Sequence, residues 1–307
     1  MSQVPYIRAQ DVEDRLTWTA VADALAAGHG GTRARIGDLF LSTGEDTLLS
    51  RAAWWPGTGI AVKSVTVKPG NAAAGRSTVH GAMVLFEEAS GSVEAVIDSA
   101  LVTKWKTAGD SLLGARLLAR PEAEHLVIVG AGAVAASLIE AYRSHWPDLR
   151  ITLWNRTRAR AEALAVGHAI HIADDLEAAV RSADIVACCT MSHTPVLHGD
   201  WLPQGCHVDL IGAFTAQMRE ADDTALRRAR IFVDSLETTL DHIGELKIPL
   251  DQGTITRGDI LGDLHDLCAG HAGRETPAEI TLYKNGGGAH LDLLTGQVIL
   301  STYQSLN

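Results

Sequence analysis

The segment HLVIVGAGAVA, residues 125–135, constrains the fold of this chain more than any other stretch. An uninterrupted apolar run that ends at a glycine is typical of a strand buried on both faces. Residues 131–146 then follow a helical pattern, with apolar residues at spacings of three and four. A strand, a Gly-rich turn and a helix in this order predict the first βα unit of a parallel sheet.

The turn itself has the pattern G-x-G-x-x-A, with Gly130, Gly132 and Ala135. Gly130 permits the tight turn, Gly132 lets the backbone approach a pyrophosphate, and Ala135 keeps the helix close to the strand. Free N–H groups and the helix dipole favour an anion at this helix start. We therefore predict a dinucleotide site built by Gly130, Ala131, Gly132, Ala133 and Val134.

The end of the second strand, RITLWNRT at 150–157, indicates which cofactor binds. An NAD site calls for Asp or Glu about 20 residues after the glycines, to hold the ribose 2′-hydroxyl. Here Asn155, Arg156 and Thr157 stand in that place. A carboxylate would repel a 2′-phosphate, whereas a guanidinium binds it through a charged planar fork. We expect NADPH, with NADH as the less favoured alternative. The competing interpretation is that Arg156, with Arg158 and Arg160 after it, only solvates the start of a helix.

The pattern of the chain changes near residue 120. Before it, the helical stretch WTAVADALAAGH is followed by TLLSRAAWW, GIAVKSVTV, STVHGAMVLFEE and SVEAVIDSA, which read as strands joined by hairpins. After a helix that ends near Pro121, strands and helices alternate, and the last 22 residues are again helix-like. We predict an α/β chain: a Rossmann-type parallel-sheet dinucleotide domain at 119–283, inserted in a discontinuous α+β domain formed by 1–118 and 284–307.

Composition excludes several classes of function. The net charge is −11, which argues against a nucleic-acid partner or an anionic membrane surface, because both require basic patches. The N-terminal residues lack the apolar core of a signal peptide, and no apolar run is long enough to span a membrane. The four cysteines show no metal-binding spacing. These features predict a reduced, cytoplasmic protein without a metal site.

The chain resembles the ornithine cyclodeaminase/mu-crystallin family over essentially its whole length. The stretches that carry the resemblance are GIAVKSVTVKPGN, STVHGAMVLFEEASG, LVTKWKTAGDSLLGARLLAR, VGAGAVA, WNRT and GDWLPQGCHVDLIGAFTAQMREAD. WNRT and the last stretch are similar to the NADP-using ketimine reductases of the family, and LVTKWKTAGDS to its bacterial Δ1-pyrroline-2-carboxylate reductases. The resemblance implies that the domain formed by both chain ends binds the substrate and forms a homodimer.

By this resemblance, Arg51, Lys63 and Lys106 fall where the family binds the carboxylate of its substrate and orients the reacting carbon. Two departures matter. Arginine is commoner than lysine at position 106, and the segment between Arg51 and Lys63 is short compared with several relatives. From strand alternation alone, Lys63 could face either solvent or a pocket, since its neighbours along the strand are apolar. The resemblance favours the pocket.

The resemblance also implies which residues lie near the nicotinamide. Thr78 and Val79 match such positions in the first domain. In the dinucleotide domain the matching positions are Thr190, Met191, Ser192, Ile211 and Gly212. The segment YKNGGGAHLD, where relatives have a Lys, small residues and an Asp, is unusually rich in glycine, and we expect Gly286 to be a further cofactor neighbour.

Phe214 decides between reactions of the family. By the resemblance, true cyclodeaminases carry an aspartate there, which takes up or releases a proton as ammonia leaves. Phenylalanine cannot take up or release a proton. Glu220 and Asp222 are the nearest titratable residues in this stretch. They belong to the segment READ, residues 219–222, which favours the start of a helix. We therefore expect a reductase of cyclic ketimine carboxylates, such as Δ1-pyrroline-2-carboxylate or Δ1-piperideine-2-carboxylate. The alternatives are an ornithine cyclodeaminase, an alanine dehydrogenase, and a non-catalytic crystallin-like protein that binds NADPH and a small ligand.

Overall fold

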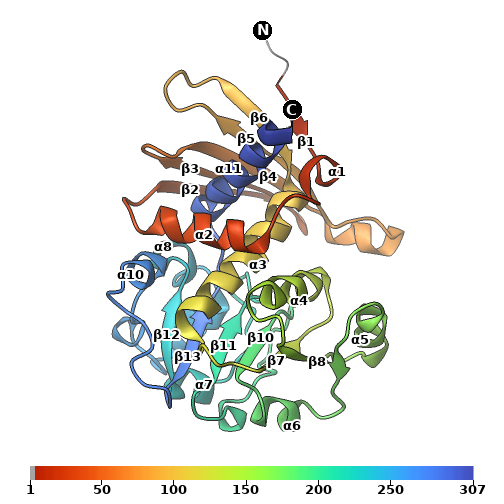
Figure 1. Cartoon of the computed structure of the whole chain (residues 1–307), viewed down its shortest axis with the longest axis vertical. Coiled ribbons are helices and arrows are strands. Elements are labelled where there is room, and N and C mark those ends of the chain that lie inside the picture. The colour runs from red at the N-terminus through yellow and green to blue at the C-terminus, as the bar shows by residue number, and fades with distance from the viewer. Residues whose placement is uncertain (1–3, 307) are drawn as a thin grey trace. The chain divides into compact units, whose positions relative to one another are not determined.

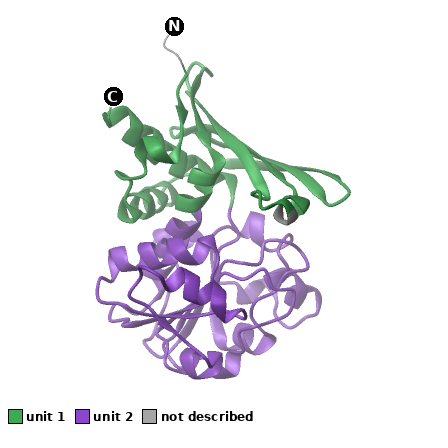
Figure 2. Ribbon diagram, turned by 90° about the vertical axis from the view of Figure 1, so that its right-hand side faces the viewer, with its two compact units in different colours: residues 1–106, 288–307 green, residues 107–287 purple. Residues whose placement is uncertain are grey.

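The computed structural model describes residues 4–306, and these divide into two units (Figure 2). Unit 1 joins the chain up to residue 106 with the chain from residue 288 onward, and unit 2 comprises residues 107–287. The divisions predicted from the sequence lie after residues 118 and 283. In the structure the first division lies after residue 106, inside the long helix α3 (Ser99–Leu118). The chain therefore passes from unit 1 to unit 2 without a linker.

Unit 1 is built on a six-stranded sheet with the order β1-β6-β5-β4-β3-β2. All neighbouring strands are antiparallel except β1 and β6, which are parallel. Residues in β4 alternate between buried and half-buried, as expected for a sheet that is covered on one face. The C-terminal helix α11 packs against β2, β3, β4, β5 and α2 (Figure 1). The strands and helices of unit 1 are β1 (Tyr6–Ile7), α1 (Ala9–Val12), α2 (Trp18–His29), β2 (Arg35–Thr43), β3 (Asp46–Trp55), β4 (Gly59–Val67), β5 (Val79–Phe86), β6 (Val93–Asp98) and α11 (Ala289–Leu306).

Unit 2 contains a seven-stranded sheet, all parallel, with the order β12-β13-β11-β10-β7-β8-β9. The inner strands β7, β10, β11 and β13 are buried along their whole length, because helices cover both faces of a parallel sheet. Its strands and helices are β7 (His125–Val129), α4 (Ala133–His145), β8 (Arg150–Trp154), α5 (Arg158–Ala165), β9 (His171–Ile172), α6 (Leu176–Arg181), β10 (Ile185–Cys188), β11 (His207–Leu210), α7 (Asp223–Arg228), β12 (Ala229–Val233), α8 (Leu236–Thr239), α9 (Gly244–Asp251), α10 (Leu264–Cys268) and β13 (Ile280–Lys284).

The predicted fold class is confirmed: unit 2 is a Rossmann-type parallel sheet, and unit 1 combines an antiparallel sheet with helices. Four strands are not among the predicted ones: β1 and β9, which have two residues each, and the longer strands β2 and β13. β2 mixes Arg35, Asp38, Ser42 and Thr43 with a glycine and four apolar residues. β13 lies in the segment between the predicted strand ARIFVD and the C-terminal helix, to which the sequence pattern assigns no strand. β13 inserts between β11 and β12, so the last two strands are out of chain order in the sheet.

Among residues 4–306, no helix is both long and apolar enough to cross a membrane. Residues 1–3, on which part of the expectation about a signal peptide rests, lie outside the described residues.

Candidate functional site

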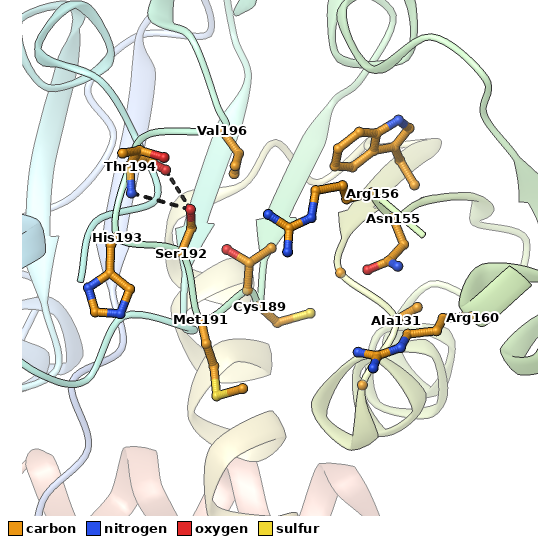
Figure 3. A pocket seen from close by; sticks show the side chains of 14 residues that line it. Ala131, Asn155, Arg156, Arg160, Cys189, Met191, Ser192, His193, Thr194 and Val196 are labelled. Carbon is orange, nitrogen blue, oxygen red and sulfur yellow. Dashed lines mark hydrogen bonds between the residues drawn. The ribbon is translucent and has the colours of Figure 1, made fainter. Parts of the chain in front are cut away.

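Unit 2 contains a cavity of about 540 Å³ at the carboxyl ends of its central strands (Figure 3). After β7 the chain builds β8 and β9 on one side, and then returns to build β10 on the other. Loops that leave adjacent strands in opposite directions open a crevice, where α/β proteins bind ligands. The lining comes from Gly130–Gly132 after β7, residues 154–156 and Arg160 around the end of β8, and residues 189–194 and Val196 after β10.

The glycines of the turn after β7 have the geometry that the motif requires. Gly130 has a φ of 121°, and a Cβ there would lie 2.9 Å from the carbonyl oxygen of Cys189. Gly132 is the N-cap of α4, and a Cβ there would meet nothing within 4 Å, so the backbone is open towards a ligand. Ala135 is fully buried against the sheet. Ala133 and Val134 begin α4, and they contribute no side chain to the lining.

Two arginines reach the cavity from the end of β8 and the start of α5. Figure 3 shows the guanidinium groups of Arg156 and Arg160 directed towards it. Within residues 4–306 neither guanidinium makes a hydrogen bond or an ion pair, whereas Arg158 between them is bound to Glu162 and Asp174. Asn155 also lines the cavity, and its amide donates to the carbonyl oxygen of Thr157, the N-cap of α5. The cavity therefore offers two cationic groups beside a neutral amide.

The loop after β10, residues 190–196, forms the opposite wall and is called the pocket loop below. It contains the predicted residues Thr190, Met191 and Ser192, all of which line the cavity. The predicted residues Ile211 and Gly212 lie behind it at the end of β11. A Cβ on Gly212 would lie 1.8 Å from the carbonyl oxygen of Thr190, so only glycine fits this contact.

Unit 1 brings the three predicted cationic residues into one charged cluster. Arg51 on β3 lies directly opposite Lys63 on β4, and on its other side opposite Asp38 on β2, so the three side chains share one face of the sheet. Arg51 Nη2 donates to Asp38 Oδ2 over 2.6 Å. Lys63 is 6% exposed, which places it on the covered face and not in solvent.

The partner of Lys63 is Asp292 on α11, which is not among the site residues predicted from the sequence. Lys63 Nζ donates to Asp292 Oδ1 over 2.6 Å. Burial lowers the pKa of Lys63 below its ordinary value, and Lys106 and Arg51 lower it further, while Asp292 opposes them. Burial alone would raise the pKa of Asp292, but the three cations outweigh it and hold that pKa below its ordinary value.

Lys106 lies on α3 at the end of unit 1 and is 6% exposed. In the described part of the chain its ammonium makes no hydrogen bond or ion pair. Asp292 Oδ2 is likewise buried without a hydrogen-bond partner among these residues. Arg51, Lys63 and Lys106 with Asp38 and Asp292 carry one net positive charge when all are ionised. A buried cationic group without a bound anion is costly, and a substrate carboxylate would supply that anion.

Three further predicted residues belong neither to the lining of the cavity nor to the cationic cluster. Thr78 and Val79 belong to unit 1, at the start of β5, where Val79 is 44% exposed. Gly286 follows β13 in unit 2 and does not line the cavity; its N–H donates to Asp234 Oδ2 over 2.9 Å. The expected contacts of these three residues with the nicotinamide remain predictions.

Phe214, in the segment after β11, is 56% exposed, and its ring can neither take up nor release a proton. Of the two nearby acids, Asp222 is the N-cap of α7, which agrees with the helix start predicted at residues 219–222. Glu220 does not belong to this helix: it is fully buried, and its carboxylate is bound by the backbone of the two loops after β10 and β11. Sequence contains no local signal for this, because its partners lie on other loops.

The fold and the cavity together define a Rossmann-type nucleotide-binding protein with a second, mainly antiparallel unit. The model of the ornithine cyclodeaminase/mu-crystallin family matches residues 56–306. The chain belongs to this family.

Individual relatives agree with this assignment. The chain is 50% identical over 296 residues to a Δ1-pyrroline-2-carboxylate reductase of Paracoccus denitrificans, and the match covers 94% of each chain. An archaeal alanine dehydrogenase dimer with bound NAD is similar in structure, with a TM-score of 0.92 and 25% identity over 99% of this chain and 97% of that one. Δ1-Pyrroline-2-carboxylate reductase of Thermococcus litoralis, solved with NADH and L-proline, has a TM-score of 0.91 at 23% identity, covering 99% and 98%.

Proposed function

We propose that this protein is an NADPH-dependent reductase of cyclic ketimine carboxylates, converting Δ1-pyrroline-2-carboxylate, Δ1-piperideine-2-carboxylate or both to L-proline and L-pipecolate. The observation that carries the proposal is the cluster of Arg51, Lys63 and Lys106, a carboxylate clamp that includes a buried ammonium without a partner among the described residues. The relative from Paracoccus denitrificans, half identical over nearly the whole chain, bears the name of this activity. Five- and six-membered rings differ by one methylene, which a pocket discriminates by only about 1–3 kcal/mol, so we expect activity on both.

The residues of unit 2 fit a dinucleotide. The open backbone at Gly132 and the start of α4 would hold the pyrophosphate, and the pocket loop with Thr190, Met191 and Ser192 would flank the nicotinamide. Arg156 and Arg160 would bind a 2′-phosphate, which supports NADPH over NADH. The bound cofactor supplies a hydride, and the protein supplies position and charge.

The clamp would act on the carboxylate that the ring carries next to its C=N bond. Lys106 and Arg51 would neutralise this carboxylate, and Lys63 would hold the reacting carbon in place. Reduction adds a hydride to the carbon of the protonated C=N bond, and the nitrogen keeps its proton. Because the pKa of Lys63 is lowered, its ammonium is also suited to deliver that proton to the ring nitrogen.

Phe214 supports a reductase over a cyclodeaminase, because release of ammonia from ornithine needs an acid or base that the ring lacks. An alanine dehydrogenase would use the same clamp on an open-chain imine formed from a 2-oxo acid and ammonia. Its structural likeness to this chain is the observation that keeps it as the second candidate. A protein that only binds NADPH would not need a carboxylate clamp.

We further propose a cytoplasmic homodimer formed through unit 1. β2 is an edge strand of its sheet, and Leu39, Phe40 and Leu41 on it are each more than 50% exposed. An edge strand with exposed apolar side chains is prone to pair with another chain. We therefore propose that a second copy of this protein covers these three residues. Its four cysteines are free, which suits a reducing compartment.

The test follows NADPH absorbance with purified protein and Δ1-pyrroline-2-carboxylate, with Δ1-piperideine-2-carboxylate, and with pyruvate plus ammonia in parallel. L-Ornithine with NAD, read as released ammonia, is the fourth arm. Fast loss of NADPH with the cyclic ketimines alone supports the proposal. Turnover only with pyruvate and ammonia would favour the dehydrogenase, ammonia from ornithine would favour the cyclodeaminase, and tight NADPH binding without turnover would favour the binding protein.

A further inference from the structure

Glu220 holds together the two loops that leave the central strands β10 and β11. Its Oε1 atom accepts hydrogen bonds from the N–H of Thr190 (2.6 Å) and from its hydroxyl (2.8 Å). Its Oε2 atom accepts from the N–H groups of Gly212 (2.6 Å) and Ala213 (3.2 Å). Four donors converge on one fully buried carboxylate, an arrangement that favours its ionised form.

The backbone of the same segment closes the pocket loop at its far end. The carbonyl oxygen of Glu220 accepts from the N–H groups of Val196 (2.8 Å) and Leu197 (2.9 Å). The N–H of Arg219 donates to the carbonyl oxygen of Ser192 over 2.9 Å. Between these ends the hydroxyl of Ser192 donates to the carbonyl oxygen of Thr194 (Figure 3). The pocket loop is therefore attached to residues 219–220 at its start, middle and end.

Glu220 is itself fixed from behind by two further buried groups. Glu245 on α9 accepts hydrogen bonds from the N–H groups of Glu220 (2.7 Å) and Ala221 (2.9 Å). Lys284 on β13 is fully buried and donates to the carbonyl oxygens of Leu210 and Asn285, and its charge attracts both glutamates. Because Glu220 is held from this side, its carboxylate can fix the positions of the loops after β10 and β11.

We infer that Glu220 is the positioning residue of the cofactor site: its carboxylate fixes the pocket loop against the loop after β11, and so shapes the wall that receives the nicotinamide. The inference rests on the proposed function for the identity of the ligand. Glu220 does not line the cavity, so it acts through Thr190 and not by touching the cofactor.

The decisive variant is Glu220→Gln, which keeps the size of the side chain but turns an N–H group towards the N–H of Thr190 or Gly212. We expect the Kd for NADPH, measured by fluorescence without substrate, to rise at least about tenfold. Hydrogen exchange of residues 190–197 in the cofactor-free protein should become faster. Thr190→Val removes only the hydroxyl donor and should raise the Kd about threefold.

A matched control is Asp263→Asn, a buried acid of unit 2 that caps α10. It should leave the NADPH Kd and the exchange of the pocket loop unchanged. Wild-type affinity and exchange in Glu220→Gln would overturn the inference. If Glu220→Gln does not fold, Thr190→Val decides, and unchanged affinity there would overturn it. If the wild type binds NADPH but reduces no ketimine, the proposed function fails, while these binding results still judge Glu220.

A pH profile separates positioning from a purely structural role. The ionisable groups that face Glu220 are Lys284, Glu245, Asp209, Cys188 and Cys189. Burial raises the pKa of Glu220 and outweighs the attraction of Lys284 and the hydrogen bonds. As the pH falls, protonation replaces an acceptor by an O–H group, so NADPH affinity should fall in the wild type relative to Glu220→Gln. Parallel profiles would contradict the inference; titration of the 2′-phosphate is common to both proteins and cancels.

Discussion

Lys63 Nζ and Asp292 Oδ1 are 2.6 Å apart, and neither side chain is more than 7% exposed. The pair joins strand β4 to the C-terminal helix α11 on the face that also carries Arg51. Asp292 supplies one negative charge to a group of three cations, so removing either partner changes the charge of the whole cluster. Breaking a buried ion pair from one side leaves an uncompensated charge, which commonly costs about 3–5 kcal/mol.

Lys63→Ala should lower kcat/KM for the cyclic ketimine at least about 100-fold, because a charge-assisted contact and the position of the substrate are lost together. The Kd for NADPH should change far less, because Lys63 does not line the cofactor cavity. The control is Lys68→Ala, an exposed lysine just beyond the same strand, paired with Asp46. Equal losses in both variants would contradict a role for Lys63 in the clamp.

Asp292→Asn should move the alkaline limb of the kcat/KM profile to lower pH. Lys63 loses its proton as the pH rises through its pKa, and the clamp then loses a charge. Asp292 raises this pKa by its negative charge, so its removal lowers the pKa further below the ordinary value. Steady-state kinetics at alkaline pH measure this fall in kcat/KM. If the pH of the fall is the same in Asp292→Asn, a group other than Lys63 causes it.

Arg156→Ala should raise the Kd for NADPH about 10- to 100-fold and leave the Kd for NADH nearly unchanged, because only NADPH carries the 2′-phosphate. Arg160→Ala should have the same direction, since both side chains reach the cavity. Arg158→Ala is the matched control, as its guanidinium is occupied by Glu162 and Asp174. A uniform loss for both cofactors would indicate a structural effect in place of phosphate recognition.

Phe40→Asp should shift the protein from dimer to monomer at micromolar concentration. Phe40 is 60% exposed on the edge strand β2, and a charge there would oppose burial against a second chain. Sedimentation equilibrium measures the change. Val166→Asp is the control, because Val166 is 80% exposed in unit 2 and outside the proposed interface. A monomeric wild type would contradict the proposed dimer.

Asp209→Asn should become relatively more stable than the wild type as the pH rises from 5 to 7. Burial raises the pKa of Asp209 to about 7, from 3.8. Between these values the folded state keeps a proton that the unfolded state has lost, so the wild type loses stability as the pH rises. The difference should grow by about 1.4 kcal/mol for each pH unit in this window.

Urea titrations of both proteins at several pH values measure this difference. His207, whose pKa burial lowers to about 3, adds a pH dependence of the opposite sign to both proteins and cancels in the comparison. A constant difference between pH 5 and 7 would mean that Asp209 is already ionised in the folded protein at pH 5.

The sequence alone determined the features that depend on neighbouring residues. A buried strand, the G-x-G-x-x-A turn and a following helix lie within residues 125–146, so their local pattern predicted both the βα unit and the phosphate site. The local pattern also predicted the place of Arg156, because the second strand of such a unit ends about 20 residues after the glycine turn. The three cationic residues of unit 1 came from the resemblance to the family, and their pattern on strands left solvent and pocket equally open for Lys63.

Only the tertiary structure decided which of these residues act on one another. Lys63 and Asp292 are 229 positions apart, and Glu220 binds loops that follow two different strands. Such contacts depend on sheet order and on the return of the C-terminal helix, which no local pattern encodes. For the same reason no local pattern shows that β13 inserts between β11 and β12. Burial then set the charges, because the pKa values of Lys63 and Asp209 are shifted mainly by their removal from water.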